Sequence, residues 1–181
     1  MSEEIDNVLK NEKVVKSMDK LKKERVEVDI NPKKFLLEYT KEELKKLEAQ
    51  STEGLSEEDV KLLEQTKKNY TENVETYSKA QLKAVIVPLK YRDLQIIKSG
   101  IFEAVQSAQQ YNWDDAVKIR AMIREERTLT VYLSLKKKDN VAQPYYSSLE
   151  EICKETDTTI DELYNIYLEN FVLTEEERKN S

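Results

Sequence analysis

The chain lacks histidine altogether and has a single cysteine among its 181 residues. Histidine is the side chain best suited to proton transfer near neutral pH and the commonest transition-metal ligand. Its absence excludes a Ser-His-Asp triad and a Cys-His pair, and it argues against zinc sites and histidine-bearing di-iron bundles. We therefore expect a protein that is not an enzyme, with no catalytic residue, no cofactor and no metal ligand.

Glycine and proline are also scarce, with two and three residues. Strands joined by tight turns need glycine at positive φ, so the composition argues against an all-β fold. Charged residues make up 36% of the chain, well above the ~25% of average globular proteins, and leave apolar residues for only a thin core. We predict a mainly α chain. Its N-terminal half is expected to be a helical hairpin or coiled coil, followed by a small helical bundle with at most a two-stranded β clasp.

Long apolar runs are missing as well. No stretch approaches the ~20 apolar residues that span a bilayer, and the first residues are acidic where a secretory signal would be apolar. The net charge of −6 argues against nucleic-acid partners, because such binding neutralises phosphates with Lys and Arg. We expect a cytoplasmic protein without membrane contact. Its partners are expected to be proteins, and these could include further copies of the same chain in a homo-oligomer.

Residues 1–30 are expected to form an N-terminal arm. Apolar residues recur at helical spacing from Ile5 to Leu21, and the segment Val26–Ile30 then alternates valine and isoleucine with acidic residues, which indicates a short strand. The compact apolar run Val85–Leu89 predicts a second strand or an extended connector. Pairing of the two would close a small clasp.

Residues 31–85 are expected to form an antiparallel helical hairpin. Asn31 followed by proline is a helix start signal, and Gly54 lies in the turn between the two helices. From Val60 to Ala84 apolar residues follow a narrow seven-residue repeat flanked by charge, which is typical of a hairpin or a coiled coil.

Residues 86–181 are expected to form a helical C-terminal domain. Its first helix has a wide apolar face, typical of a core helix, and contains Gly100, whose missing side chain would permit a close helix crossing. A second helix is expected to begin at Asn112 as N-cap and to run to Leu135. A loop over Val141–Ser148 and two short helices follow. The one cysteine is expected to be a partly buried structural thiol.

Aromatic residues supply the candidate contact residues. Tyrosine is abundant, with ten residues, and is enriched at protein interfaces. The candidate protein-binding residues are Trp113, Tyr145, Tyr146, Tyr164 and Tyr167. Trp113 is interpreted as a packed anchor. For the tyrosines, packing in the core with hydroxyls that reach the surface remains the alternative.

One basic stripe stands out in the acidic chain. Arg120, Arg124 and Arg127 are spaced i, i+4 and i+7 and share one helical face, which could bind an anion, phosphates or an acidic partner. The alternative is a charge network with Glu125, Glu126 and acidic helices nearby. A nucleic-acid-binding regulatory protein that uses this face is therefore the alternative function.

Three segments carry a resemblance to a known group of proteins. They are Pro88-Leu89-Lys90-Tyr91-Arg92-Asp93, Asn112-Trp113-Asp114-Asp115 and the ending Leu168-Glu169-Asn170-Phe171-Val172-Leu173-Thr174-Glu175-Glu176-Glu177. From Val87 onward the chain resembles small helical proteins encoded among bacteriophage tail genes, chiefly tail assembly chaperones. The resemblance implies a non-enzymatic protein in the host-cell cytoplasm that binds a self-assembling tail protein until it is built into the particle, or else a structural part of the virion. The long charged N-terminal half departs from that pattern.

Overall fold

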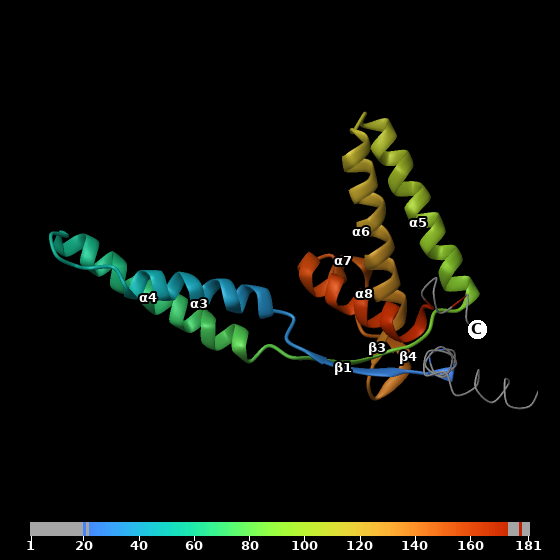
Figure 1. Ribbon diagram of the computed structural model, residues 1–181, viewed down its shortest axis with the longest axis horizontal. Helices are drawn as coiled ribbons and strands as arrows, with labels where there is room; N and C mark the ends of the chain where they lie inside the picture. Colours follow the sequence, from blue (N-terminus) through green and yellow to red (C-terminus); the bar gives the residue numbers. More distant parts are fainter. Residues whose placement is uncertain (1–19, 21, 174–177, 179–181) are drawn as a thin grey trace, which may run out of the picture. The chain divides into compact units, whose positions relative to one another are not determined.

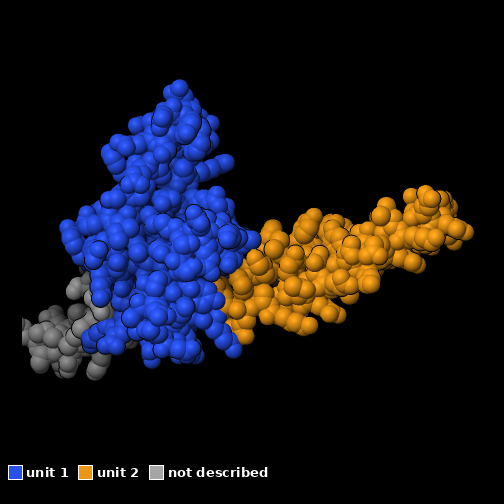
Figure 2. All heavy atoms as spheres, turned by 180° about the vertical axis from the view of Figure 1, so that it is seen from behind, with its two compact units in different colours: residues 1–28, 83–181 blue, residues 29–82 orange. Residues whose placement is uncertain are grey.

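The structure is a computed structural model that describes residues 20, 22–173 and 178. The helix predicted between Ile5 and Leu21, apart from Lys20, and the acidic turn at Thr174–Glu177 lie outside the described residues. The chain divides into two compact units, residues 29–82 and residues 1–28 with 83–181 (Figure 2). The described residues form six helices and four strands, so the prediction of a mainly helical chain is confirmed.

The unit of residues 29–82 consists mainly of two helices that pack against each other, α3 (Lys34–Glu48) and α4 (Glu57–Ser78) (Figure 1). Gly54, in the connection, has φ 83°, the left-handed region that favours glycine. Ser56 then caps α4 by accepting a hydrogen bond from the Asp59 N–H. Thr40 is the one buried residue of the two helices, so their exposed faces outweigh the surface they bury.

The sheet has the strand order β1-β2-β3-β4, and the strands are β1 (Val26–Ile30), β2 (Leu82–Ile86), β3 (Leu135–Lys137) and β4 (Asn140–Pro144). The predicted strand Val26–Ile30 is confirmed, and so is its place beside the second apolar run. The second strand begins earlier than predicted, at Leu82. Beyond β2 the Val87 N–H donates at 3.0 Å to the carbonyl of Ser134, the residue before β3.

The prediction of at most two strands is wrong, because β3 and β4 form a further antiparallel pair. The chain leaves helical geometry at Leu135, the predicted last residue of the helix, with φ −79° and ψ 122°. Leu135 lies opposite Ile86 in the sheet and has no exposed surface, so burial against the neighbouring strand favours the extended backbone there. Pro144 is tolerated because β4 is an edge strand.

Two long helices of the unit that contains residues 83–181, α5 (Tyr91–Gln110) and α6 (Asp115–Ser134), pack along each other. The close crossing predicted at Gly100 is confirmed. A Cβ atom on this residue would collide with the Leu129 side chain and lie 3.2 Å from the Glu125 Oε1. The missing side chain of Gly100 therefore sets how closely the two helices approach.

The predicted N-cap of α6 is wrong by two residues. Asp114 is the N-cap, and its Oδ1 accepts a hydrogen bond from the Val117 N–H at 2.9 Å. Asn112 lies in the preceding turn with φ 51°. Asparagine enters this left-handed region more readily than most residues, so it suits the turn between α5 and α6.

The helices α7 (Leu149–Ile152) and α8 (Asp157–Phe171) pack against α6. The largest side chains without solvent exposure come from β3, α7 and α8: Leu135, Ile152 and Leu163. Cys153, at the end of α7, is exposed, contrary to the expected partial burial. Figure 1 shows that the end of the α5–α6 pair around the turn between them projects beyond α7 and α8.

Candidate functional site

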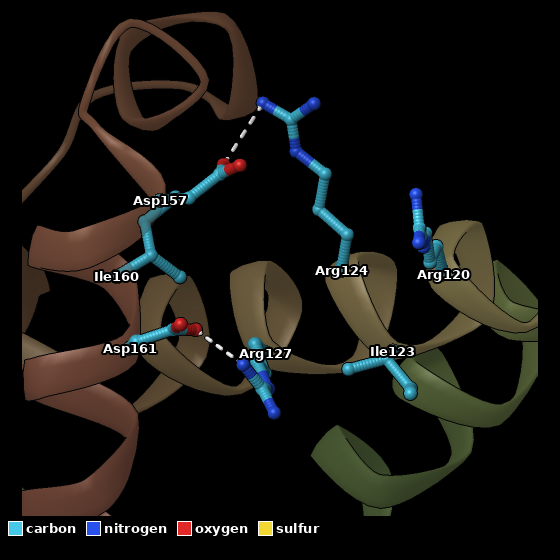
Figure 3. Close-up of a pocket in the computed structure, with 7 residues that line it drawn as sticks. All are labelled: Arg120, Ile123, Arg124, Arg127, Asp157, Ile160 and Asp161. Carbon is cyan, nitrogen blue, oxygen red and sulfur yellow. Dashed lines mark hydrogen bonds and ion pairs between the residues drawn. The ribbon is translucent and has the colours of Figure 1, made fainter.

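A cavity of about 230 Å³ between α6 and α8 brings together the three arginines of the predicted basic stripe (Figure 3). Its lining residues are Arg120, Ile123, Arg124 and Arg127 from α6 and Asp157, Ile160 and Asp161 from α8. Residues three and four apart on a helix lie on the same face, so each helix contributes its charged row together with one isoleucine. The cavity therefore has charged edges and an apolar floor.

Two of the three arginines are held by carboxylates of α8. The Arg127 Nη1 donates to the Asp161 Oδ1 at 2.6 Å, between side chains that are 38% and 44% exposed. The Arg124 Nη2 lies 3.3 Å from the Asp157 Oδ1, and both side chains are mostly exposed. Arg120 has no hydrogen-bond or ion-pair partner in the part of the chain that the structure describes.

The charge network that was the alternative for these arginines exists, and its carboxylates come from a nearby acidic helix and not from Glu125 and Glu126. Asp157 and Asp161 take the place expected for Glu125 and Glu126. Glu126 instead accepts a hydrogen bond from the Tyr164 hydroxyl at 3.4 Å. Glu125 lies on the α5 side of α6, where burial and then the neighbouring Glu103 raise its carboxyl pKa.

The four candidate tyrosines divide between core and surface. Tyr146 and Tyr167 are buried, at 3% and 8% exposure, so they offer little area to a partner in this structure. Tyr145 is half-buried and meets Tyr146 edge to face, with ring centroids 5.1 Å apart. Tyr164 is also half-buried, and the Arg127 guanidinium lies over its ring, 5.7 Å from the centroid.

Burial also changes the acidity of these tyrosines. The pKa of Tyr146 is raised well above its ordinary value, first by burial and then by the nearby Glu155 carboxylate. Burial likewise raises the pKa of Tyr145, Tyr164 and Tyr167. All four phenols therefore stay protonated at neutral pH and act as packing groups or hydrogen-bond donors.

Trp113 lies at the free end of the α5–α6 pair, in the turn that the two helices share. It stacks on Tyr111, with ring centroids 6.2 Å apart, and remains 43% exposed. Other large apolar side chains of this end are exposed too. We define the apolar tip as Phe102, Tyr111, Trp113, Val117 and Ile119.

Sequence reasoning placed Phe102 on the wide apolar face of a core helix and Val117 and Ile119 along the next helix, and it named none of the three as a candidate contact residue. A signal for Phe102 was present. At 100° per residue it projects roughly 140° away from the buried Ile97 and roughly 120° away from the buried Ala108. A stripe wider than one neighbouring helix can cover leaves part of its apolar surface exposed.

Comparisons of the chain with models of protein families, with curated proteins and with solved structures found no match. The resemblance to tail assembly chaperones therefore stays a prediction. Across the described residues, no helix is long and apolar enough to cross a membrane. Nor does that part of the chain contain a group of three or more Cys, Asp or Glu side chains placed to hold a metal ion.

Proposed function

We propose that this chain is a non-enzymatic assembly or structural protein that binds other proteins through its helix faces. The apolar tip supports this proposal. Phe102 of α5 is 61% exposed and Ile119 of α6 is 56% exposed, and the two helices pack along each other. Single exposed apolar residues are common, but several on one projecting element, aromatic ones among them, are typical of an interaction surface.

The partner that we propose follows from the resemblance to phage tail proteins. It is a self-assembling tail or other virion protein with an apolar surface, held in soluble form in the host-cell cytoplasm in a chaperone-like manner. Such a task needs apolar area to cover the assembling surface and a charged remainder that keeps the complex soluble. The 36% of charged residues and the net charge of −6 suit that second requirement.

The same proposal treats α3 and α4 as an antiparallel helical hairpin that provides a second contact face. Phe35 and Tyr39 are four residues apart on α3, so they share one side of the helix, and both are more than half exposed. The spacing of these two side chains suits a partner helix or a second copy of the chain.

The ion pairs in the cavity favour protein binding over nucleic-acid binding. A phosphate that approached Arg124 or Arg127 would have to displace Asp157 or Asp161, which come from the same chain. Phosphate contacts supply most of the affinity in non-specific nucleic-acid binding. Among the three arginines of this cavity, one is unpaired, which gives such binding little support.

Co-expression with the products of the flanking genes tests the proposed function. We expect one of these proteins to be soluble with the wild-type chain, to co-purify with it, and to precipitate with the double variant Phe102→Ser, Ile119→Ser. The control variant Val141→Ser, Leu149→Ser removes exposed apolar side chains elsewhere in the same unit and should behave as wild type. Equal co-purification with wild type and the tip variant would contradict the proposal.

A further inference from the structure

Arg120 is the cavity residue with free capacity for an anion. Arg127 is engaged by Asp161 at 2.6 Å, whereas the 3.3 Å pair between Arg124 and Asp157 joins side chains that are 61% and 69% exposed. Exposed pairs of this kind contribute little and exchange readily. Three guanidinium groups face two carboxylates, so one positive charge remains in excess at the Arg120 end of the cavity.

The N-terminus of α8 adds to this local potential. The helix begins at Asp157, beside the Arg124 side chain, after the N-cap residue Thr156. The first turn of a helix carries a partial positive charge from its unpaired N–H groups. A carboxylate that enters beside Arg120 meets the charge of that guanidinium, whereas a polyanion of many charges meets the net charge of −6 of the whole chain.

The two isoleucines that line the cavity favour an acidic protein segment over other anions, because such a segment also carries apolar side chains. Ile160 lies between Asp157 and Asp161 on α8 and is almost fully buried, whereas Ile123, on α6, is 41% exposed (Figure 3). Ile119, one turn before Ile123, continues the apolar surface from the cavity to the apolar tip. The cavity volume of about 230 Å³ leaves room for one apolar side chain.

We infer that this cavity binds an acidic, amphipathic segment of a protein partner, with a carboxylate at Arg120 and an apolar side chain between Ile123 and Ile160. The inference rests on the proposed protein-binding function and adds the chemistry of the segment that the partner presents. Backbone phosphates or lipid headgroups would satisfy Arg120 but would leave the exposed part of Ile123 without an apolar group to cover it.

A peptide titration followed by NMR tests the inference on the full chain. The probe is a short synthetic helical peptide with leucine and glutamate on one face, and its counterpart has glutamine at every glutamate. We expect the acidic peptide to shift the amide signals of Arg120, Ile123 and Ile160, and Arg120→Gln to weaken its binding about fivefold. Arg92→Gln, an exposed arginine of α5, is the matched control and should leave the affinity unchanged. The glutamine peptide should bind wild type and Arg120→Gln equally weakly.

Three results would overturn the inference. These are unchanged binding in Arg120→Gln, signals that shift only outside the cavity, and displacement of the peptide by duplex DNA or by phosphatidylserine–phosphatidylcholine vesicles.

Failure of the inference can be distinguished from failure of the proposed function. If a flanking-gene product co-purifies while Arg120→Gln affects neither it nor the peptide, the inference alone fails. If no product co-purifies but the peptide binds as expected, the proposed function fails, while the inference that the cavity binds an acidic, amphipathic segment still holds.

Discussion

Gly100 of α5 faces Leu129 of α6 so closely that a methyl group on the glycine would collide with the leucine side chain. We expect Gly100→Ala to lower the free energy of unfolding. Overpacking of a core contact costs about 1–3 kcal/mol, and the better helix propensity of alanine returns about 1 kcal/mol, so a net loss of about 1 kcal/mol is expected. Urea unfolding followed by circular dichroism measures this loss.

Gly100→Val extends the same test. Its larger side chain should destabilise the fold more than Gly100→Ala does. Ser99→Ala is the matched control, because Ser99 is exposed on the same helix and its change should alter stability by no more than a few tenths of a kcal/mol. Unfolding midpoints for Gly100→Ala at or above those of wild type would show that the crossing accommodates a methyl group.

Much of the local structure could be predicted from the sequence. Alternation revealed the strand Val26–Ile30, and a helix glycine revealed the crossing of α5 and α6. The strand pair β3–β4 escaped prediction for a physical reason. Lys136 and Lys137 follow a helix, and cations are common at helix C-termini, so local sequence favours a helix end where pairing with β2 imposes a strand.

The candidate site shows the same limit. The spacing of Arg120, Arg124 and Arg127 predicts one helical face, but nothing local predicts that Asp157 and Asp161, some thirty residues later, will lie opposite. Those contacts depend on how α8 packs on α6. Tertiary packing likewise decides which of the adjacent Tyr145 and Tyr146 is buried. Both are tyrosines, so residue type alone cannot predict which side chain enters the core.

The raised pKa of Tyr146 predicts a loss of stability in alkali. Its phenol releases a proton less readily in the folded chain than in the unfolded chain, where the pKa is about 10. The stabilisation is complete below about pH 10 and is lost as the pH rises further. We expect the free energy of unfolding of wild type to fall above pH 10 by up to roughly 1.4 kcal/mol per pH unit more than that of Tyr146→Phe, which cannot ionise.

Urea titrations of both proteins from pH 8 to pH 11 check this expectation. For each protein, the free energy of unfolding at each pH is compared with its value at pH 8, which removes the effect of the lost hydroxyl itself. The other three tyrosines with raised pKa are present in both proteins, so their contributions cancel in the difference. Parallel curves would mean that the Tyr146 phenol ionises as readily in the folded chain as in the unfolded one.

The two ion pairs between α6 and α8 should differ in strength. We expect a double-mutant cycle with Arg127→Gln and Asp161→Asn to give a coupling of about 0.5–1 kcal/mol, because this pair is short and partly shielded from water. The cycle with Arg124→Gln and Asp157→Asn should give a coupling near zero, because both side chains are largely exposed.

Each cycle cancels effects that belong to one residue alone, such as the contact of Arg127 with the Tyr164 ring or the position of Asp157 in the first turn of α8. Urea unfolding of the four proteins in each cycle supplies the couplings. A larger coupling for Arg124 and Asp157 would show that this exposed pair is held more firmly than its exposure implies.

Trp113, the one tryptophan of the chain, provides an internal probe of the apolar tip. Because its side chain is 43% exposed in the free protein, a partner that covers the tip should remove water from the indole. We expect its fluorescence emission to move to shorter wavelengths and its quenching by acrylamide to decrease when a partner binds.

The complex formed with Trp113→Phe at saturating partner concentration supplies the partner's own emission for subtraction. The variant Phe102→Ser should reduce the shift at a given partner concentration. A saturated complex in which Trp113 emission and quenching stay as in the free protein would place the interface elsewhere on the chain.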